Sequence, residues 1–134
     1  MTGLIAALDT ADPAVAARWA GAALAFAGLG LRIAAFRALG ASYSRTLRVN
    51  EDQKLVTSGM YRVIRHPGYL SSLILWSGAV LATGSLIGVG VVLAALLGAY
   101  IRRIRVEEAM LLSSFGESYR TYQNTSWKLV PYIY

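Results

Sequence analysis

The sequence lacks cysteine altogether and contains a single histidine, His66. A chain without cysteine forms no disulfide, offers no thiolate nucleophile and cannot hold an iron–sulfur cluster. One histidine does not make a usual zinc ligand set either. We therefore expect neither thiol nor metal catalysis from this protein.

Charge is also scarce. Only 15% of the residues are charged and 56% are hydrophobic, and the mean hydropathy is +0.49, which is too apolar for an ordinary soluble domain of this size. Residues 69–101 carry no charge at all, whereas one membrane helix needs only about 20 apolar residues. The run should therefore fold back at Thr83-Gly84-Ser85, which predicts a hairpin of helices at about 67–83 and 85–105.

An earlier apolar segment predicts a first membrane helix at about 13–39. It begins with Asp12 as a cap and Pro13 at the first helical position, and after Arg18 it carries no charge before Arg32. Its small residues suit close helix packing in lipid, although alanine-rich membrane helices contain such residues by composition alone; they are Gly21, Ala25, Gly28 and Gly30.

The basic residues predict an orientation. Two acids, Asp9 and Asp12, precede the first helix, whereas the loop after it and the end of the hairpin are rich in arginine and lysine. The positive-inside rule places loop 40–66 and the C-terminus in the cytoplasm. A composition rich in alanine, glycine and arginine favours a bacterial inner membrane. The net charge of +6 fits anionic headgroups, and no basic face of a soluble domain indicates nucleic-acid binding.

A hairpin brings the residues before it and after it to the same membrane face. Arg103 and Glu107 are four residues apart and share one helical face. Apolar and aromatic residues recur at helical spacing further on and predict an interfacial amphipathic helix at about 106–123; they are Met110, Leu111, Phe115, Tyr119 and Tyr122. The expected fold is all-α, with three transmembrane helices in one domain, 1–134, that is small enough to favour a homo-oligomer.

Each polar residue at this face has a structural and a functional interpretation. His66 could be a snorkelling interfacial residue or part of a site. Arg103 and Glu107 could form a stabilising ion pair or bind a ligand. The tyrosines could form an aromatic belt; they are Tyr61, Tyr69, Tyr119 and Tyr122. Pro67 can start a helix whose first backbone donors would face a polar ligand group.

Two sequence blocks carry a family resemblance. Residues 59–69 read G-x-Y-x-x-x-R-H-P-x-Y, and after the hairpin come R-x-x-x-E-E at 103–108 and F-G-x-x-Y-x-x-Y at 115–122. In order and spacing these blocks resemble the isoprenylcysteine carboxyl methyltransferase family and its bacterial and archaeal relatives, and phospholipid N-methyltransferases share the pattern. The resemblance covers about residues 40–131 and implies an integral membrane enzyme that uses S-adenosylmethionine.

The resemblance also implies a set of site residues. Arg103 resembles the residue that holds the substrate carboxylate, and Thr46 matches a polar contact upstream. The implied cofactor contacts are Lys54, Leu55, Val56, Tyr61, His66, Pro67, Gly68, Tyr69 and Glu107. The chain departs from the family in having Lys54 in place of the eukaryotic histidine, Lys128 in place of arginine in many relatives, and fewer membrane helices than the eukaryotic enzymes.

The implied function is O-methylation of the carboxylate of an isoprenylcysteine or similar lipophilic acceptor at the membrane face. One alternative is a phospholipid N-methyltransferase with His66 or Glu108 as the base. Another is a membrane scaffold subunit that keeps the helices without the chemistry. The expected partners are the lipid bilayer and a lipophilic or prenylated acceptor.

Overall fold

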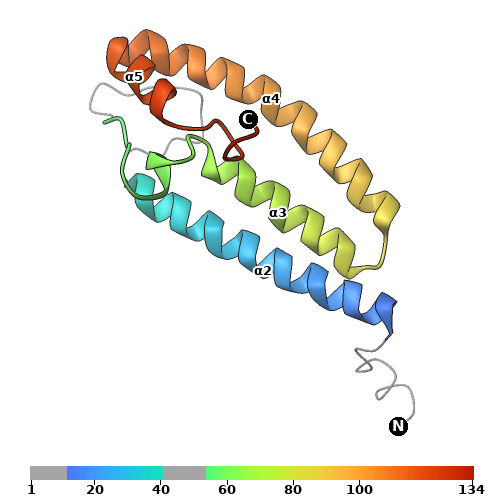
Figure 1. Cartoon of the computed structure of the whole chain (residues 1–134). Helices are drawn as coiled ribbons and strands as arrows, with labels where there is room; N and C mark the ends of the chain where they lie inside the picture. Colours follow the sequence, from blue (N-terminus) through green and yellow to red (C-terminus); the bar gives the residue numbers. More distant parts are fainter. Residues whose placement is uncertain (1–11, 41–53) are drawn as a thin grey trace.

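The computed structural model describes residues 12–40 and 54–134. Within these residues the chain is helical and forms no β-strand. The elements, in chain order, are α2 (Pro13–Leu39), the short 3₁₀ helix η2 (Gly59–Arg62), α3 (Pro67–Ala82), α4 (Leu86–Phe115) and α5 (Glu117–Thr125). Helices α2, α3 and α4 lie side by side, as Figure 1 shows.

Helix α2 has the bounds that the sequence predicts. The Asp12 carboxylate accepts a hydrogen bond from the Ala14 N–H at 2.8 Å, and Pro13 occupies the first turn, where no N–H donor is needed. The helix ends at Gly40, which has a positive φ of 51° and donates its N–H to the carbonyl of Phe36. Local capping signals therefore define both ends of this helix.

Helices α2 and α3 pack backbone against backbone. A Cβ atom on Gly21 would lie 2.8 Å from the carbonyl oxygen of Gly78, and one on Gly28 would lie 2.9 Å from that of Ser71. Added side chains at these positions would force the helices apart, so the small residues have a packing role here. The same prediction is wrong for Gly30, where a Cβ would meet nothing within 4 Å.

The hairpin turns where expected, but its second helix is longer than predicted. Gly84 takes a φ of 87°, and the Ser85 hydroxyl accepts from the Gly88 N–H at 3.0 Å to begin α4. The predicted boundary near residue 105 is wrong, because α4 continues to Phe115. Charged residues do not end a helix, whereas Gly116 has a φ of 58° and separates α4 from α5. The predicted interfacial helix is thus divided between two elements.

Two helices, α2 and α4, are long and apolar enough to cross a membrane by length and composition, while α3 is shorter, with 16 residues. Only 11% of the apolar window of α2 and 6% of that of α4 is buried. Large apolar side chains such as Phe26 and Ile87 lie exposed on the outer surfaces. A core helix of a soluble protein would be mostly buried, so this distribution favours lipid-facing helices.

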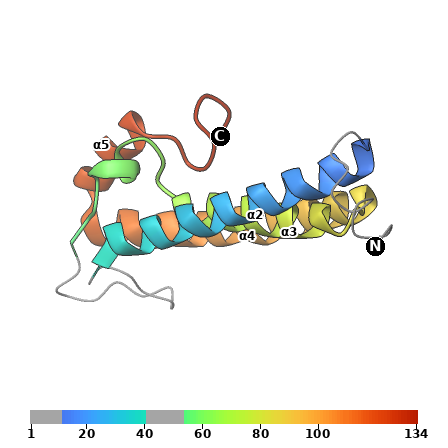
Figure 2. The same cartoon turned by 90° about the horizontal axis from the view of Figure 1, so that it is seen from below.

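The polar elements gather at one end of the helical layer. Figure 2 shows η2, α5 and the C-terminal segment on one side of the layer formed by α2, α3 and α4. We call this end, made of residues 59–66, 103–108 and 117–128, the polar end. Leu129 of the C-terminal segment is buried together with Leu73 of α3 and Ile104 of α4. The C-terminal segment therefore packs against both α3 and α4.

Candidate active site

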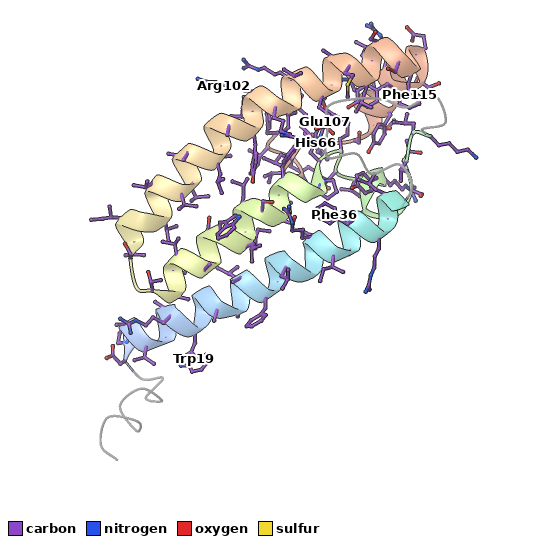
Figure 3. The ribbon with its side chains drawn as sticks, turned by 180° about the vertical axis from the view of Figure 1, so that it is seen from behind. Trp19, Phe36, His66, Arg102, Glu107 and Phe115 are labelled. Carbon is purple, nitrogen blue, oxygen red and sulfur yellow. The ribbon has the colours of Figure 1, made fainter. Side chains whose placement is uncertain are left out.

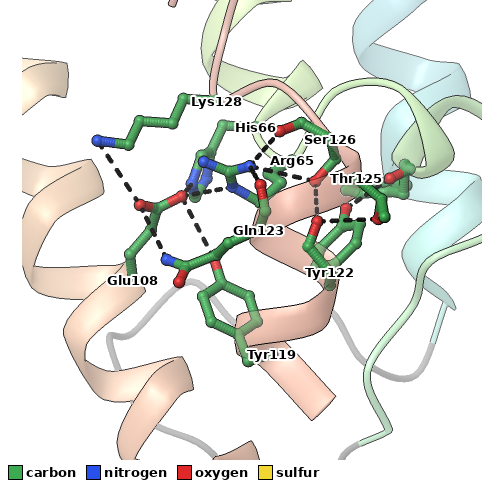
Figure 4. Close-up of polar contacts among 10 residues, drawn as sticks. Arg65, His66, Glu108, Tyr119, Tyr122, Gln123, Thr125, Ser126 and Lys128 are labelled. Carbon is green, nitrogen blue, oxygen red and sulfur yellow. Dashed lines mark hydrogen bonds and ion pairs between the residues drawn. The ribbon is translucent and has the colours of Figure 1, made fainter. Parts of the chain in front are cut away.

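The polar end has a buried acid at its centre. Glu108 of α4 is 7% exposed, and its Oε1 accepts from Arg65 Nε at 2.7 Å and lies 3.1 Å from His66 Nε2. Figure 4 shows the further contacts that Glu108 makes with the C-terminal half. The Tyr119 hydroxyl donates to its Oε1 at 3.4 Å, and Gln123 Nε2 donates to its Oε2 at 3.5 Å. Lys128 Nζ lies 3.9 Å from Oε2. A buried carboxylate is stable only with such partners, so these residues form one structural unit, the Glu108 cluster.

Arg65 links the start of α3 to the C-terminal segment by hydrogen bonds. Its Nη1 donates to the carbonyl of Gln123 at 3.1 Å and to the hydroxyl of Ser126, also at 3.1 Å. The backbone adds to this, because Arg65 N–H donates to the Trp127 carbonyl at 2.7 Å and Trp127 N–H donates to the Val63 carbonyl at 2.8 Å. The segment before Pro67 therefore has its position set by residues about sixty positions later.

The tyrosines of the polar end are donors in the interior. Tyr119 is 1% exposed, and burial together with the charge of Glu108 raises its pKa, so its hydroxyl stays protonated. Burial raises the pKa of Tyr122 to about 12, and its hydroxyl donates to the Tyr61 carbonyl at 2.6 Å. Tyr61 is itself buried and donates to the Ala35 carbonyl at 3.3 Å. The aromatic-belt interpretation is therefore wrong for these three tyrosines.

A second polar group lies between α3 and α4. The Tyr69 hydroxyl donates to Glu107 Oε2 at 2.8 Å and accepts from Arg103 Nε at 2.7 Å. The Tyr69 ring packs on Tyr100, with centroids 4.8 Å apart, and lies 5.8 Å from the His66 ring. Tyr69 thus bridges the acid and the cation that the sequence placed on one face of the helix.

The structure brings most of the predicted site residues to this end. Figure 3 shows His66 and Glu107 close to each other between α3 and α4, with Arg102 pointing away from the bundle. Pro67 is buried and starts α3, with Gly68 and Tyr69 in its first turn. Lys54, Leu55 and Val56 precede η2 without regular secondary structure. Thr46 lies outside the described residues.

Two expectations change. His66 is 5% exposed and bound to Glu108, so the snorkelling interpretation is wrong. The sequence also gave no role to Arg65 and none but that of a base to Glu108, although these two form the centre of the polar end. The Glu107-Glu108 pair contains a signal for this interior role. Adjacent residues on a helix face different neighbours, so the two acids are expected to have different partners.

An open hollow of about 710 Å³ lies between η2 and α5. Its lining is rich in hydroxyl groups and includes none of the predicted site residues; the described residues that line it are Thr57, Arg62, Val63, Ser118, Thr121, Tyr122, Thr125 and Trp127. This hollow is therefore distinct from the Tyr69 group.

These features define a class: helical proteins with exposed apolar spans and polar residues converging at one end. The phospholipid methyltransferase family model matches residues 16–118, and the chain belongs to this family. The protein-S-isoprenylcysteine O-methyltransferase of Schizosaccharomyces pombe is 35% identical over 115 residues, which are 83% of this chain and 49% of the relative. The Dictyostelium discoideum protein of that name is 30% identical over 122 residues, or 87% of this chain and 50% of the relative.

A solved structure has the same fold. The eukaryotic intramembrane Ras methyltransferase ICMT (isoprenylcysteine carboxyl methyltransferase) matches with a TM-score of 0.82 and 28% sequence identity, over 90% of this chain and 45% of that chain. The chain spans about half the length of the curated relatives it matches. Together with the two apolar spans, these likenesses make the chain an all-α integral membrane protein.

Proposed function

We propose that this chain is an S-adenosylmethionine-dependent methyltransferase that O-methylates the carboxylate of an isoprenylcysteine or similar lipophilic acceptor. The observation that carries the proposal is the Tyr69 group, in which Glu107 and Arg103 share one hydroxyl next to the first turn of α3. The names of the relatives support the acceptor class. The proposal also places the polar end in the cytoplasm, as the basic residues indicate.

The residues at this end suit a cationic cofactor. Glu107 is partly buried, and among the described residues its side chain accepts from the neutral Tyr69 hydroxyl and forms no ion pair. Its negative charge is therefore available to an ammonium or sulfonium group. S-adenosylmethionine supplies a methyl group activated by a positively charged sulfur. We assign its binding to Lys54, Leu55, Val56, Tyr61, His66, Pro67, Gly68, Tyr69 and Glu107.

The acceptor requires a cation rather than a base. A carboxylate is already ionised at neutral pH, so Arg103 needs only to bind and orient it, and a guanidinium can do so with two parallel hydrogen bonds. Orientation of two reactants is worth up to about 7–11 kcal/mol of the barrier. Tyr69 contributes to this orientation, because its hydroxyl accepts a hydrogen bond from Arg103 Nε at 2.7 Å.

Phospholipid N-methylation is the alternative, and the family description favours it. An amine acceptor arrives protonated and needs a base, for which His66 and Glu108 are the candidates. Both are buried and bound to each other in the Glu108 cluster, an arrangement that supports the carboxyl reaction instead.

The pH dependence of methylation separates these two reactions. We expect purified protein in lipid nanodiscs to methylate N-acetyl-S-farnesylcysteine at a rate that is nearly constant from neutral to mildly alkaline pH. Methylation of phosphatidylethanolamine alone, at a rate rising with pH, would exclude the carboxyl reaction. Calorimetry that detected no binding of S-adenosylmethionine or its demethylated product would leave the scaffold interpretation.

A further inference from the structure

Arg32 is an arginine within a membrane helix, about two turns before the end of α2. Charged residues at such positions are costly in lipid and usually mark ligand sites. The Arg32 guanidinium donates from Nη1 to the Ser72 hydroxyl on α3, and its Cζ lies 4.9 Å from the centre of the Phe36 ring. Ser72 is 2% exposed and donates in turn to the Gly68 carbonyl at 3.0 Å.

The positive charge of Arg32 is not neutralised by an ion pair with any residue that the structure describes. Ser72 and Phe36 are uncharged, and within residues 12–40 and 54–134 no acidic side chain forms an ion pair with Arg32. A guanidinium has five N–H donors in a plane, and the bond to Ser72 uses only one end of that plane. The remaining donors suit an anionic oxygen group near headgroup depth.

Arg32 and Arg103 approach the same face of α3 from opposite neighbours. Tyr69, Ser72 and Trp76 follow one another at spacings of three and four residues, so they form one stripe along that helix. Arg103 of α4 donates to Tyr69, and Arg32 of α2 donates to Ser72. The two cations therefore contact consecutive positions of a single stripe.

The other end of this stripe is apolar and open. Trp76 lies one turn beyond Ser72, toward the hairpin turn, and is 53% exposed. On the side of Arg32 that is nearer the hairpin turn, a ligand cannot enter between α2 and α3, because Gly28 and Gly78 bring the two backbones into contact. An amphiphile held at this place would therefore lie along the stripe, with its anionic end at the arginines and its chain on Trp76.

We propose that Arg32, positioned by Ser72, is a second cationic contact for the anionic end of the methyl acceptor, and that Trp76 contacts the acceptor's lipid chain. This inference rests on the proposed function, since it names further residues of the same acceptor site. Two cations on opposite sides of the stripe keep the carboxylate ionised and limit its rotation.

The test compares a carboxylate ligand with its neutral counterpart. Dissociation constants of N-acetyl-S-farnesylcysteine and of the corresponding carboxamide are measured in phosphatidylcholine nanodiscs for wild type and variants. We expect wild type to prefer the acid, and Arg32→Ala to lower that preference by about tenfold or more, as for loss of a charge-assisted hydrogen bond. Arg32→Lys and the milder Ser72→Ala should each retain part of the preference, and binding of S-adenosylhomocysteine should not change.

Arg37→Ala is the matched control, because Arg37 is an exposed arginine in the last turn of the same helix. It should leave the acid preference as in wild type. Equal weakening of acid and amide by Arg32→Ala would show a structural role and overturn the proposal. An unchanged preference, accompanied by lost sensitivity to added phosphatidylglycerol, would make Arg32 a lipid-phosphate site instead. If wild type bound neither ligand, the proposed function itself would be wrong.

Discussion

Glu107 and Glu108 are adjacent on α4, yet their hydrogen-bond partners differ. Glu108 is turned into the interior, where Arg65, His66 and the C-terminal half surround its oxygens. Glu107 instead accepts a hydrogen bond from the Tyr69 hydroxyl of α3. A rotation of about 100° per residue is enough to separate a structural acid from one available to a ligand. The neighbours, and not the residue type, determine the role.

The largest expected effect is on the structural acid. Glu108→Gln removes the countercharge of Arg65, which is only 9% exposed, and breaking a buried pair in this way costs about 3–5 kcal/mol. The free energy of unfolding in detergent should fall by that amount. Glu117→Gln is the control, because Glu117 pairs with Arg120 at the surface, and we expect a change of less than about 1 kcal/mol. If Glu108→Gln had the unfolding free energy of wild type, the Glu108 cluster would contribute little to the stability of the fold.

The second prediction concerns the acid available to a ligand. Glu107→Gln should weaken binding of S-adenosylmethionine by about 1.5–3 kcal/mol, because a charge-assisted hydrogen bond is lost. The unfolding free energy should change much less than for Glu108→Gln, since Glu107 has no buried charge partner among the described residues. Calorimetry in nanodiscs measures the free energy of S-adenosylmethionine binding. Unchanged cofactor affinity in a folded variant would make both acids structural.

The smallest effect is expected at the edge of the Glu108 cluster. Lys128 Nζ lies 3.9 Å from Glu108 Oε2 and 4.9 Å from the centre of the Tyr134 ring. Lys128→Arg would present a planar guanidinium to the carboxylate and should raise the free energy of unfolding by about 0.5 kcal/mol. A small upward shift of the unfolding midpoint would agree with this. A lower midpoint would mean that the guanidinium does not fit between Glu108 and Tyr134.

The fold could be predicted where local signals define it. Asp12 and Pro13 mark the start of α2, and the uncharged run with its central glycine marks the hairpin. The predicted end of α4 near residue 105 is wrong, because the change from apolar to charged residues near Arg102 does not mark a helix boundary. Hydropathy reports the depth of a residue in the membrane, whereas the backbone changes direction only at Gly116.

The candidate site was predictable in part for a similar reason. Arg103 and Glu107 share a helical turn, so their spacing alone placed them together. The contact of Arg65 with Glu108 joins positions 43 residues apart, which no periodicity reports. The resemblance predicts His66 as a cofactor contact, and the contact of its Nε2 with Glu108 is one that the motif does not report. Local patterns thus brought Arg103 and Glu107 together and missed the buried contact of Arg65 with Glu108.

The bonds between Arg65 and Ser126, 61 residues apart, have a consequence for the order of folding. The helices can enter the membrane one after another as the chain is made, whereas the backbone N–H groups of Arg65 and His66 gain their acceptors only after residues 127 and 128 have been synthesised. Long-range contacts of this kind form late, because the intervening chain must first be ordered. During synthesis the Arg65 guanidinium can pair with Glu108 first, whereas its donors to Gln123 and Ser126 stay hydrated until the C-terminal segment arrives.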